Sequence, residues 1–114
     1  MPKKISRITV RDYKTAGSFW GRLSGLMFKK NMPGCEVLFF PRCGAIHTFF
    51  MRFPIDVIMT DNNYIVVDFA EGLKPFTIFS ARGAKHTFEA AGGFIKKNKI
   101  KKGDFILLHE TKKR

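Results

Sequence analysis

The apolar stretch over residues 43–61 constrains the fold more than any other part of this chain. It carries three polar residues, His47, Arg52 and Asp56, and Pro54 divides it. Because proline lacks a backbone donor and cannot sit inside a sheet ladder, we expect two short strands here, one on each side of the break. Burying a charge is costly unless the charge has a partner or water, so the three polar residues mark the place where a site is expected.

The remainder of the chain shows the same pattern of short apolar runs between turns. Strands are expected over residues 5–11, 36–40, 46–52, 55–60, 64–69, 76–79, 86–90 and 105–109. A short helix is expected over 18–28, with Ser18 as its cap, and a helical turn over 94–98. Many short strands with a turn every ~8–12 residues predict a mostly β fold, an antiparallel sandwich or barrel with one or two short helices.

The chain has 114 residues, which is room for one domain, and its thirteen phenylalanines are spread widely enough to supply a single core. Its two cysteines, Cys35 and Cys43, make no disulfide framework, and we expect both to be free thiols. The basic N-terminal residues are not followed by an uninterrupted apolar segment, and no run approaches the length of a membrane helix. We therefore expect a soluble, cytoplasmic, single-domain protein over residues 1–114.

The net charge of +12 is concentrated at the two ends of the chain. Residues 1–30 hold eight basic and one acidic side chain, residues 31–90 hold five and six, and residues 91–114 hold eight and two, giving +7, −1 and +6. Such basic ends are candidates for contact with RNA, the ribosome or an anionic membrane. The alternative is a lysine-rich solvated surface that aids solubility, and the absence of a nucleic-acid motif favours it.

Strand alternation sorts the polar residues of the central run. His47 falls on the apolar face together with Phe53, whereas Arg52 falls on the opposite face. Arg52 and Asp56 form either a clamp for a ligand or an ion pair that closes the bend at Pro54, and the second reading is favoured. A histidine beside threonine and phenylalanine is more often a hydrogen-bonded core residue than a general base or a metal ligand.

Four further features of the sequence bear on chemistry. Arg22, a guanidinium among apolar neighbours, either binds a carboxylate or phosphate, or caps the short helix or pairs with Asp12. Glu89 is expected on the solvent side of its strand in preference to a cleft, and Asp104 is expected to be a turn residue. Cys43 and His47 give only a Cys-x-x-x-His spacing, whereas zinc sites use three or four ligands, so no metal or cofactor is predicted.

Four motifs occur in a specific order along almost the whole chain. They are Arg-Leu-x-Gly-Leu-Met-Phe (22–28), Ile-His-Thr-Phe-Phe-Met-Arg-Phe-Pro-Ile-Asp (46–56), Glu-x-x-Gly (89–92) and Gly-Asp (103–104). This set resembles the family called domain of unknown function 192. The resemblance implies one small, mostly β domain with a sandwich or jelly-roll-like architecture, and it implies no activity. Arg52 and Asp56 carry over from the family pattern better than His47, which lacks a clear counterpart in one branch.

Three functional hypotheses follow. The first is a β-domain that binds a small anionic ligand or an acidic segment of a partner around Arg22, Arg52 and Asp56, with His47 beside them. The second is an RNA- or ribosome-associated protein that binds through its basic ends. The third is a hydrolase that uses His47, although the sequence shows neither a nucleophile motif nor an oxyanion hole, and therefore does not decide whether the chain is an enzyme.

Overall fold

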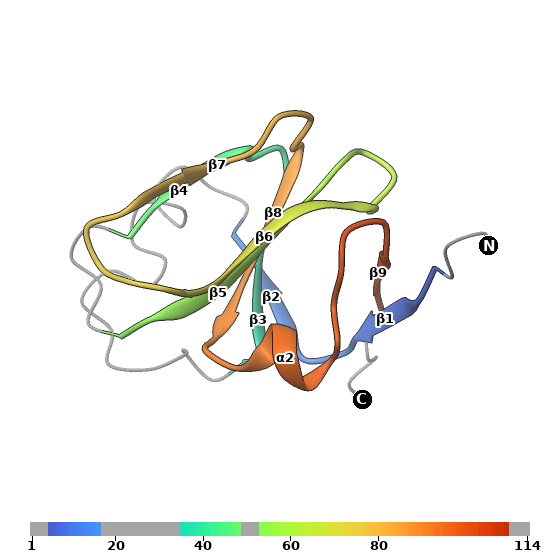
Figure 1. The fold of residues 1–114 in the computed structure, drawn as a ribbon. Coiled ribbons are helices and arrows are strands. Elements are labelled where there is room, and N and C mark those ends of the chain that lie inside the picture. The colour runs from blue at the N-terminus through green and yellow to red at the C-terminus, as the bar shows by residue number, and fades with distance from the viewer. Residues whose placement is uncertain (1–4, 17–34, 49–52, 110–114) are drawn as a thin grey trace.

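A computed structural model describes residues 5–16, 35–48 and 53–109, so the helix expected over 18–28 lies outside the described residues. The described elements are mostly strands (Figure 1). In chain order they are β1 (Arg7–Val10), β2 (Tyr13–Thr15), β3 (Val37–Phe40), β4 (Ala45–His47), β5 (Ile55–Thr60), β6 (Val66–Leu73), β7 (Ile78–Ser80), β8 (His86–Ala91), α2 (Phe94–Lys97) and β9 (Phe105–Leu108). The predicted mostly β fold is therefore confirmed, and its helical turn over 94–98 is present as α2.

Five of the strands form the main sheet, in the order β2-β3-β8-β5-β6. β8 is its central strand, antiparallel to β3 on one side and to β5 on the other. β4 and β7 form a separate antiparallel ribbon, and β1 pairs with β9 in a second two-stranded sheet. The sheets are open, so the architecture is sandwich-like and not a closed barrel.

Both faces of the main sheet are buried, which explains why β3, β5 and β8 are buried at consecutive positions instead of alternating ones. On one face lies cluster one, which brings in residues of β1, α2 and β9. Its buried members are Ile8, Val10, Val37, Phe39, Ile58, Val66, Phe88, Ala90, Phe94, Ile95, Ile100 and Ile106.

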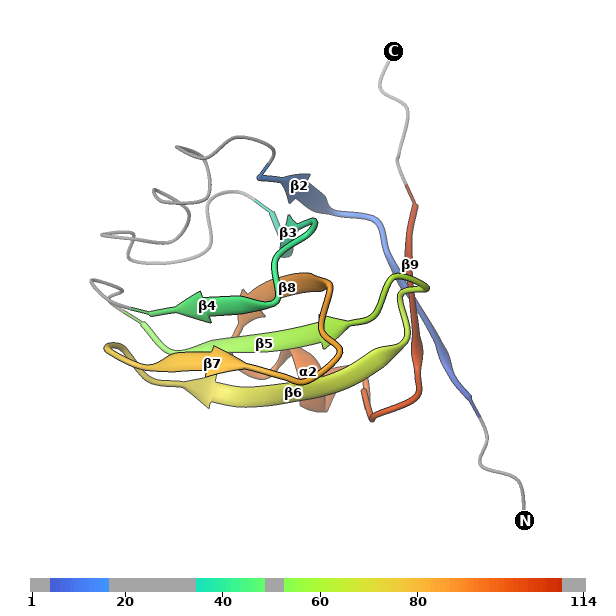
Figure 2. The same ribbon diagram turned by 90° about the horizontal axis from the view of Figure 1, so that it is seen from above.

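On the opposite face of the sheet lies cluster two, made of Cys35, Leu38, Phe40, Ile55, Val57 and Met59. Residues of the β4–β7 ribbon, among them Ile46 and Phe79, pack against it. Seen from above, the ribbon lies beside the main sheet at one end of the molecule, and β1 and β9 run together at the other end (Figure 2). The fold thus places the ribbon against one face of the central strand and the paired chain ends with α2 against the other.

Three features of the strand arrangement differ from the sequence-based expectations. β2 was not predicted, because three residues are too few for an alternating pattern to be visible. Both β1–β9 and β2–β3 are parallel pairs, whereas an antiparallel arrangement was expected. The strand expected over 46–52 is seen as β4, and its remaining residues 49–52 lie outside the described part. No helix in the described part is long and apolar enough to span a membrane.

Candidate functional site

Glu89 lies in the middle of the central strand β8 and is 5% exposed. In the register of the sheet it is directly opposite Leu38 of β3 and Val57 of β5. Directly opposed residues on neighbouring strands point to the same side of a sheet, and Leu38 and Val57 both belong to cluster two. The carboxyl group of Glu89 therefore enters the apolar cluster-two side, and the expectation of a solvent-facing Glu89 is wrong.

The carboxyl group of Glu89 has no hydrogen-bond or ion-pair partner among the described residues. Burial raises the pKa of Glu89 to about 8, because the charged form is poorly solvated among apolar side chains. Glu89 consequently holds its proton at neutral pH and presents one O–H donor on this face. Buried polar groups are nearly always paired, so such an exception identifies a candidate functional position.

A cation shares the register row of Glu89. Lys14 of β2 is paired with Leu38, which is in turn paired with Glu89, so the three positions follow one another across the sheet. Lys14 is exposed at the sheet edge, two strands away from Glu89, which corresponds to ~10 Å at the usual strand spacing. The cluster-two side therefore combines an ammonium group at its edge with a protonated carboxyl group at its centre.

Two thiols lie on the same side of the sheet, and neither forms a disulfide. Cys35 is buried in cluster two, and burial raises the pKa of its thiol. The Cys43 thiol contacts the carbonyl oxygen of Ala45 at 3.2 Å. The hydroxyl of Thr87, two residues before Glu89, donates to the carbonyl oxygen of Cys43 at 2.6 Å. Thr87 is therefore satisfied by the chain itself, in contrast to its neighbour Glu89.

Asp56 of β5, one of the predicted site residues, is also buried, at 1% exposure, but on the other side of the sheet. It is paired with Ala90, a member of cluster one. Its Oδ1 accepts the backbone N–H of Gly72 at 2.8 Å, and its Oδ2 accepts those of Gly93 and Ile95 at 3.1 and 2.8 Å. Asp56 thus ties β6 and the start of α2 to the central sheet.

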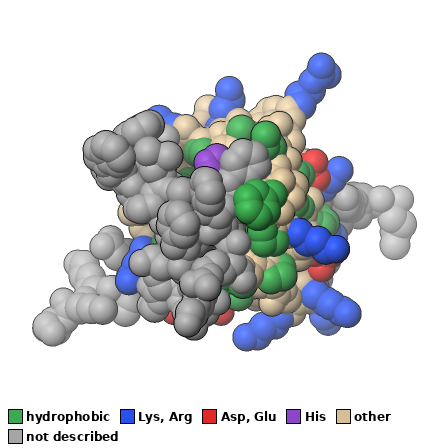
Figure 3. Space-filling model, turned by 90° about the vertical axis from the view of Figure 1, so that its left-hand side faces the viewer, with side chains coloured by type: hydrophobic (Ala, Val, Ile, Leu, Met, Phe, Trp, Pro, Cys, Tyr) green, Lys and Arg blue, Asp and Glu red, His purple; other side chains and the backbone are tan. Residues whose placement is uncertain are grey.

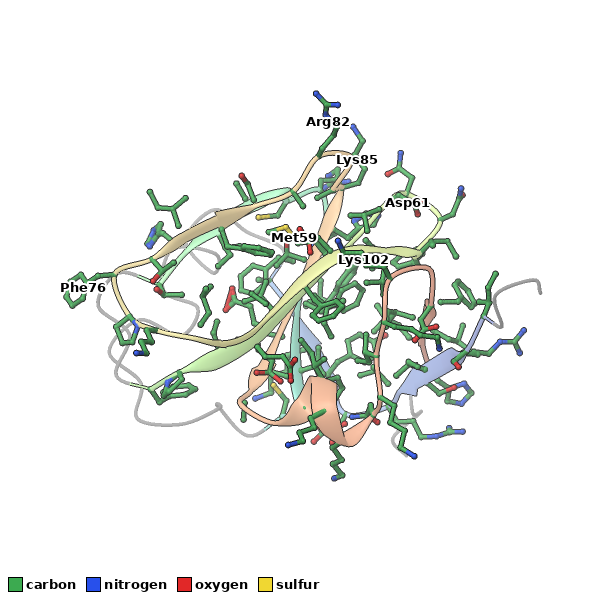
Figure 4. The ribbon with its side chains drawn as sticks, in the orientation of Figure 1. Met59, Asp61, Phe76, Arg82, Lys85 and Lys102 are labelled. Carbon is green, nitrogen blue, oxygen red and sulfur yellow. The ribbon has the colours of Figure 1, made fainter. Side chains whose placement is uncertain are left out.

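His47 ends strand β4 and is exposed, so the expectation that it lies on the buried apolar face is wrong. Its neighbour Ile46 packs on cluster two, so alternation directs His47 to the outer face of the ribbon, opposite Ile78. Ile78 and Phe76 are 69% and 70% exposed there. Figure 3 shows apolar side chains gathered on this side of the surface, and Figure 4 shows Phe76 pointing away from the molecule while Met59 lies inside it.

The four predicted site residues are accordingly not seen together. His47 lies on the outside of the ribbon and Asp56 lies beneath α2, while Arg22 and Arg52 lie outside the described residues and stay predictions. Sequence reasoning also placed Glu89 wrongly, on the solvent side of its strand, although Glu89 belongs to the Glu-x-x-Gly motif. Within the ranges that the structure describes, no group of three or more His, Cys, Asp or Glu side chains is placed to hold a metal ion.

Comparison with known proteins finds the same family that the four sequence motifs resemble. The model of the family domain of unknown function 192, described as "Uncharacterized ACR", matches residues 3–108. A UPF0127 protein of Pyrococcus horikoshii is 39% identical over 101 residues, covering 83% of this chain and 85% of the relative. A UPF0127 protein of Thermococcus kodakarensis is 35% identical over 105 residues, covering 89% of this chain and 67% of the relative.

Two solved structures share the fold. A protein of unknown function from Novosphingobium aromaticivorans aligns with a TM-score of 0.70 at 23% identity, over 80% of this chain and 70% of the other. A putative transcription regulator from Sinorhizobium meliloti aligns with a TM-score of 0.70 at 18% identity, over 80% and 76% of the two chains. At these identities the likeness concerns the arrangement of the strands alone.

Proposed function

This chain belongs to the family domain of unknown function 192, and we propose that it is a binding domain for a small anionic ligand or an acidic segment of a partner. The proposed site is the cluster-two side of the main sheet around Glu89. The observation that carries the proposal is the carboxyl group of Glu89, which is buried and lacks a partner among the described residues. A ligand would supply the hydrogen bond that the chain does not.

An anion suits this position for two reasons. With a pKa of about 8, Glu89 is uncharged at neutral pH, so it does not repel an anion and can donate its proton to an anionic oxygen in a hydrogen bond. Lys14 supplies a positive charge in the same row of the sheet. The predicted ligand-binding arginines Arg22 and Arg52 would add guanidinium groups, and they enter the test as variants.

The test is a thermal-shift screen with small carboxylates, phosphates and acidic peptides. A ligand present at a hundredfold excess over its Kd stabilises the folded state by about 2.7 kcal/mol. We expect Glu89→Leu and Lys14→Gln to reduce this stabilisation, and Glu71→Gln, at an exposed position of β6, to leave it unchanged. If no anion stabilised the wild-type protein, or if Glu89→Leu left every shift intact, the proposal would fail. An intact shift in Arg52→Ala would remove only the predicted arginine clamp.

A second candidate function, RNA binding through the basic ends, is favoured by the pairing of β1 with β9. The parallel pair joins Arg7 to Phe105 and Val10 to Leu108, so segments from the two basic ends of the sequence lie side by side at one end of the molecule (Figure 2). Several exposed cations belong to these segments, namely Arg7, Arg11, Lys96, Lys97, Lys99 and Lys102. Their combined field suits a polyanion better than either end would alone.

RNA binding of this kind must weaken steeply with salt, because each neutralised phosphate releases a counterion. We expect a single-stranded RNA to bind at low salt and the double substitution Lys96→Gln with Lys97→Gln to reduce both the affinity and its salt dependence. The matched control is Arg82→Gln with Lys85→Gln, which removes two cations from the loop between β7 and β8 (Figure 4). Equal losses in the two variants would show a nonspecific charge effect and contradict the proposal.

A further inference from the structure

The outer face of the β4–β7 ribbon exposes two large apolar side chains. Exposed positions alternate with half-buried ones over residues 74–80, and the exposed ones are Lys74, Phe76, Ile78 and Ser80. Phe76 and Ile78 are 70% and 69% exposed, more than any other large apolar side chain of the described part. Phe79, between the exposed positions, packs on cluster two. The outer face is therefore the side of the ribbon that points away from the core.

The chain holds Phe76 outward in a backbone conformation that is costly for a bulky residue. Phe76 has a φ of 62°, in the left-handed region. Thr48, which is 1% exposed, fixes this conformation, because its hydroxyl donates to the carbonyl oxygen of Lys74 at 2.6 Å and accepts the N–H of Thr77 at 2.8 Å. The carbonyl oxygen of Thr48 accepts the N–H of Phe76 at 3.1 Å. Strain that surrounding contacts maintain is typical of functional positions, and a fixed backbone loses little entropy on binding.

The ribbon and its flanking loops carry positive charge and no negative charge. Residues 41–48 and 74–85 contain no Asp or Glu. Of the five basic and six acidic side chains in residues 31–90, four of the basic ones and none of the acidic ones lie in these two ranges. Figure 4 shows Phe76 near one end of the ribbon, and Arg82 and Lys85 in the loop beyond the other end. The basic side chains are all exposed, and they are Arg42, Lys74, Arg82 and Lys85.

This combination favours one kind of partner. The net charge of +12 opposes association of two copies through this face, because like charges repel. A single-stranded RNA would stack a base on Phe76, but the aliphatic Ile78 offers no ring for the next base. A lipid bilayer accepts projecting apolar side chains of both kinds at its interface, and anionic headgroups attract the surrounding cations.

We propose that the outer face of the β4–β7 ribbon is a peripheral docking surface for an anionic lipid bilayer. Phe76 and Ile78 enter the boundary between headgroups and acyl chains, and the four basic side chains contact the headgroups. The contact is reversible and requires no segment that spans the membrane. The inference does not depend on a ligand at Glu89, because Glu89 lies on the opposite side of the ribbon, in the core.

The experiment is cosedimentation of the protein with vesicles of phosphatidylcholine, either alone or mixed with phosphatidylglycerol. The bound fraction at each lipid concentration gives the partition constant. We expect binding to the mixed vesicles and about tenfold weaker binding to phosphatidylcholine alone, since each cation near an anionic surface contributes to the attraction. Added salt should weaken binding to the mixed vesicles, because it screens exposed charges.

Substitutions of the apolar side chains test their insertion. Phe76→Ser and Ile78→Ser should each lower the partition constant for the mixed vesicles about tenfold, because each removes a large apolar side chain from the interface. Phe76→Trp should retain binding, since tryptophan favours the membrane interface. The matched control is Ile5→Ser, which removes an apolar side chain that is 64% exposed before β1, and it should bind like the wild type.

Substitutions of the cations test the contact with headgroups. Arg82→Gln with Lys85→Gln should lower the partition constant by about fivefold per cation. The matched control is Lys96→Gln with Lys97→Gln, which removes two cations of α2 on the other side of the main sheet, and it should have less effect on vesicle binding. All the substituted positions are exposed, so we expect every variant to fold, as thermal unfolding would verify.

Three results would overturn the proposal. They are the absence of binding to the mixed vesicles, equal losses in Phe76→Ser and Ile5→Ser, and equal losses in the two double cation variants. Vesicle binding that persisted in Phe76→Ser, together with a loss of single-stranded RNA binding in that variant, would assign the face to RNA and would likewise overturn the membrane proposal. None of these results bears on Glu89, which the thermal-shift screen tests separately.

Discussion

At the scale of single residues, two buried carboxyl groups of neighbouring strands differ in how the chain solvates them. Asp56 receives three backbone N–H groups in place of the water that it loses on burial. Glu89 receives no such donors from the described residues and has its pKa raised to about 8 by burial. The Asp56 carboxyl group therefore stabilises the fold, whereas the buried carboxyl group of Glu89 destabilises it. Binding of a ligand would explain why Glu89 is present at this position.

Glu89 should make the protein less stable as the pH rises. Between the ordinary pKa of a glutamate, 4.5, and about 8, the folded state keeps the proton that the unfolded state has lost. The free energy of unfolding should therefore fall by up to about 1.4 kcal/mol per pH unit in this window and level off above it. Glu89→Gln has no proton to lose, so its stability relative to the wild type should increase from pH 5 to pH 8.

Urea denaturation of both proteins at pH 5, 6, 7 and 8 measures this difference. Taking the difference between variant and wild type removes the contributions of other groups. His86 is one of these groups. Burial lowers the pKa of His86, and the nearby Arg42 lowers it further. Its contribution to the free energy of unfolding therefore falls as the pH falls, whereas that of Glu89 falls as the pH rises. A constant difference between the two proteins across the four pH values would show that Glu89 does not titrate in the folded state as described.

At the scale of elements, α2 has four residues and could not persist on its own, because a single helical turn gains too few hydrogen bonds for the backbone order that it requires. Phe94 and Ile95 bury its apolar side in cluster one. Gly93, with a φ of 100°, turns the chain into the helix, and Asp56 accepts N–H groups at its first turn. The helix is therefore stabilised by the burial of Phe94 and Ile95 and by the carboxyl group of Asp56 in β5.

Asp56→Asn should weaken this attachment. The amide keeps one acceptor oxygen and directs an NH₂ group at backbone donors, leaving buried N–H groups unsatisfied. We expect a loss of about 3 kcal/mol in the free energy of unfolding, and faster hydrogen exchange of the Ile95 amide. Glu36→Gln, at an exposed position before β3, is the control and should change stability by less than about 0.5 kcal/mol. Equal effects of the two substitutions would contradict the role assigned to Asp56.

At the scale of the whole molecule, the two chain ends are joined around Asp104, which is fully buried. Its Oδ1 accepts the N–H of Ser6 at 3.1 Å, and its Oδ2 accepts the N–H of Lys101 at 2.9 Å. The Lys101 ammonium group lies 3.1 Å from Oδ1. Asp104 was expected to be a turn residue, and it also links the segment before β1 to the turn before β9.

Burial alone would raise the pKa of Asp104, but the hydrogen bonds from Lys101 and Ser6 and the Lys101 charge hold the pKa below its ordinary value of 3.8. The stabilisation is present above pH 3.8 and is lost as the pH falls toward the lower pKa of the folded state. We expect Asp104→Asn to reduce the free energy of unfolding by about 2 kcal/mol at pH 7, with the difference shrinking below pH 4.

Acid and urea denaturation of Asp104→Asn test this link. Asp68→Asn is the control, because it breaks a solvent-exposed ion pair with Lys102 at 3.8 Å, which is worth less than about 1 kcal/mol. A loss in Asp104→Asn that stayed constant down to pH 2 would show that the carboxylate charge contributes nothing to joining the chain ends.

The sequence by itself determined most of the segments that become strands, although β2 was missed. Residues 55–60 were predicted as a strand with the bounds that β5 has, and β3, β8 and β9 lie within one or two residues of their predicted ranges. The prediction of these strands succeeded because β-branched and aromatic runs between turn residues have few other stable conformations. The family was likewise visible in the sequence, since its motifs lie at fixed positions along the chain.

Only the tertiary structure decided which polar residues are buried and on which side. Glu89 between Phe88 and Ala90 has the pattern of a strand with one solvent-facing side, and it is buried because both faces of β8 are covered by distant segments. His47 has the pattern of a core residue, and it is exposed because its ribbon uses Ile46 and Phe79 for packing. Strand alternation separates two faces, but which of them meets another layer is set by contacts between residues far apart in the chain.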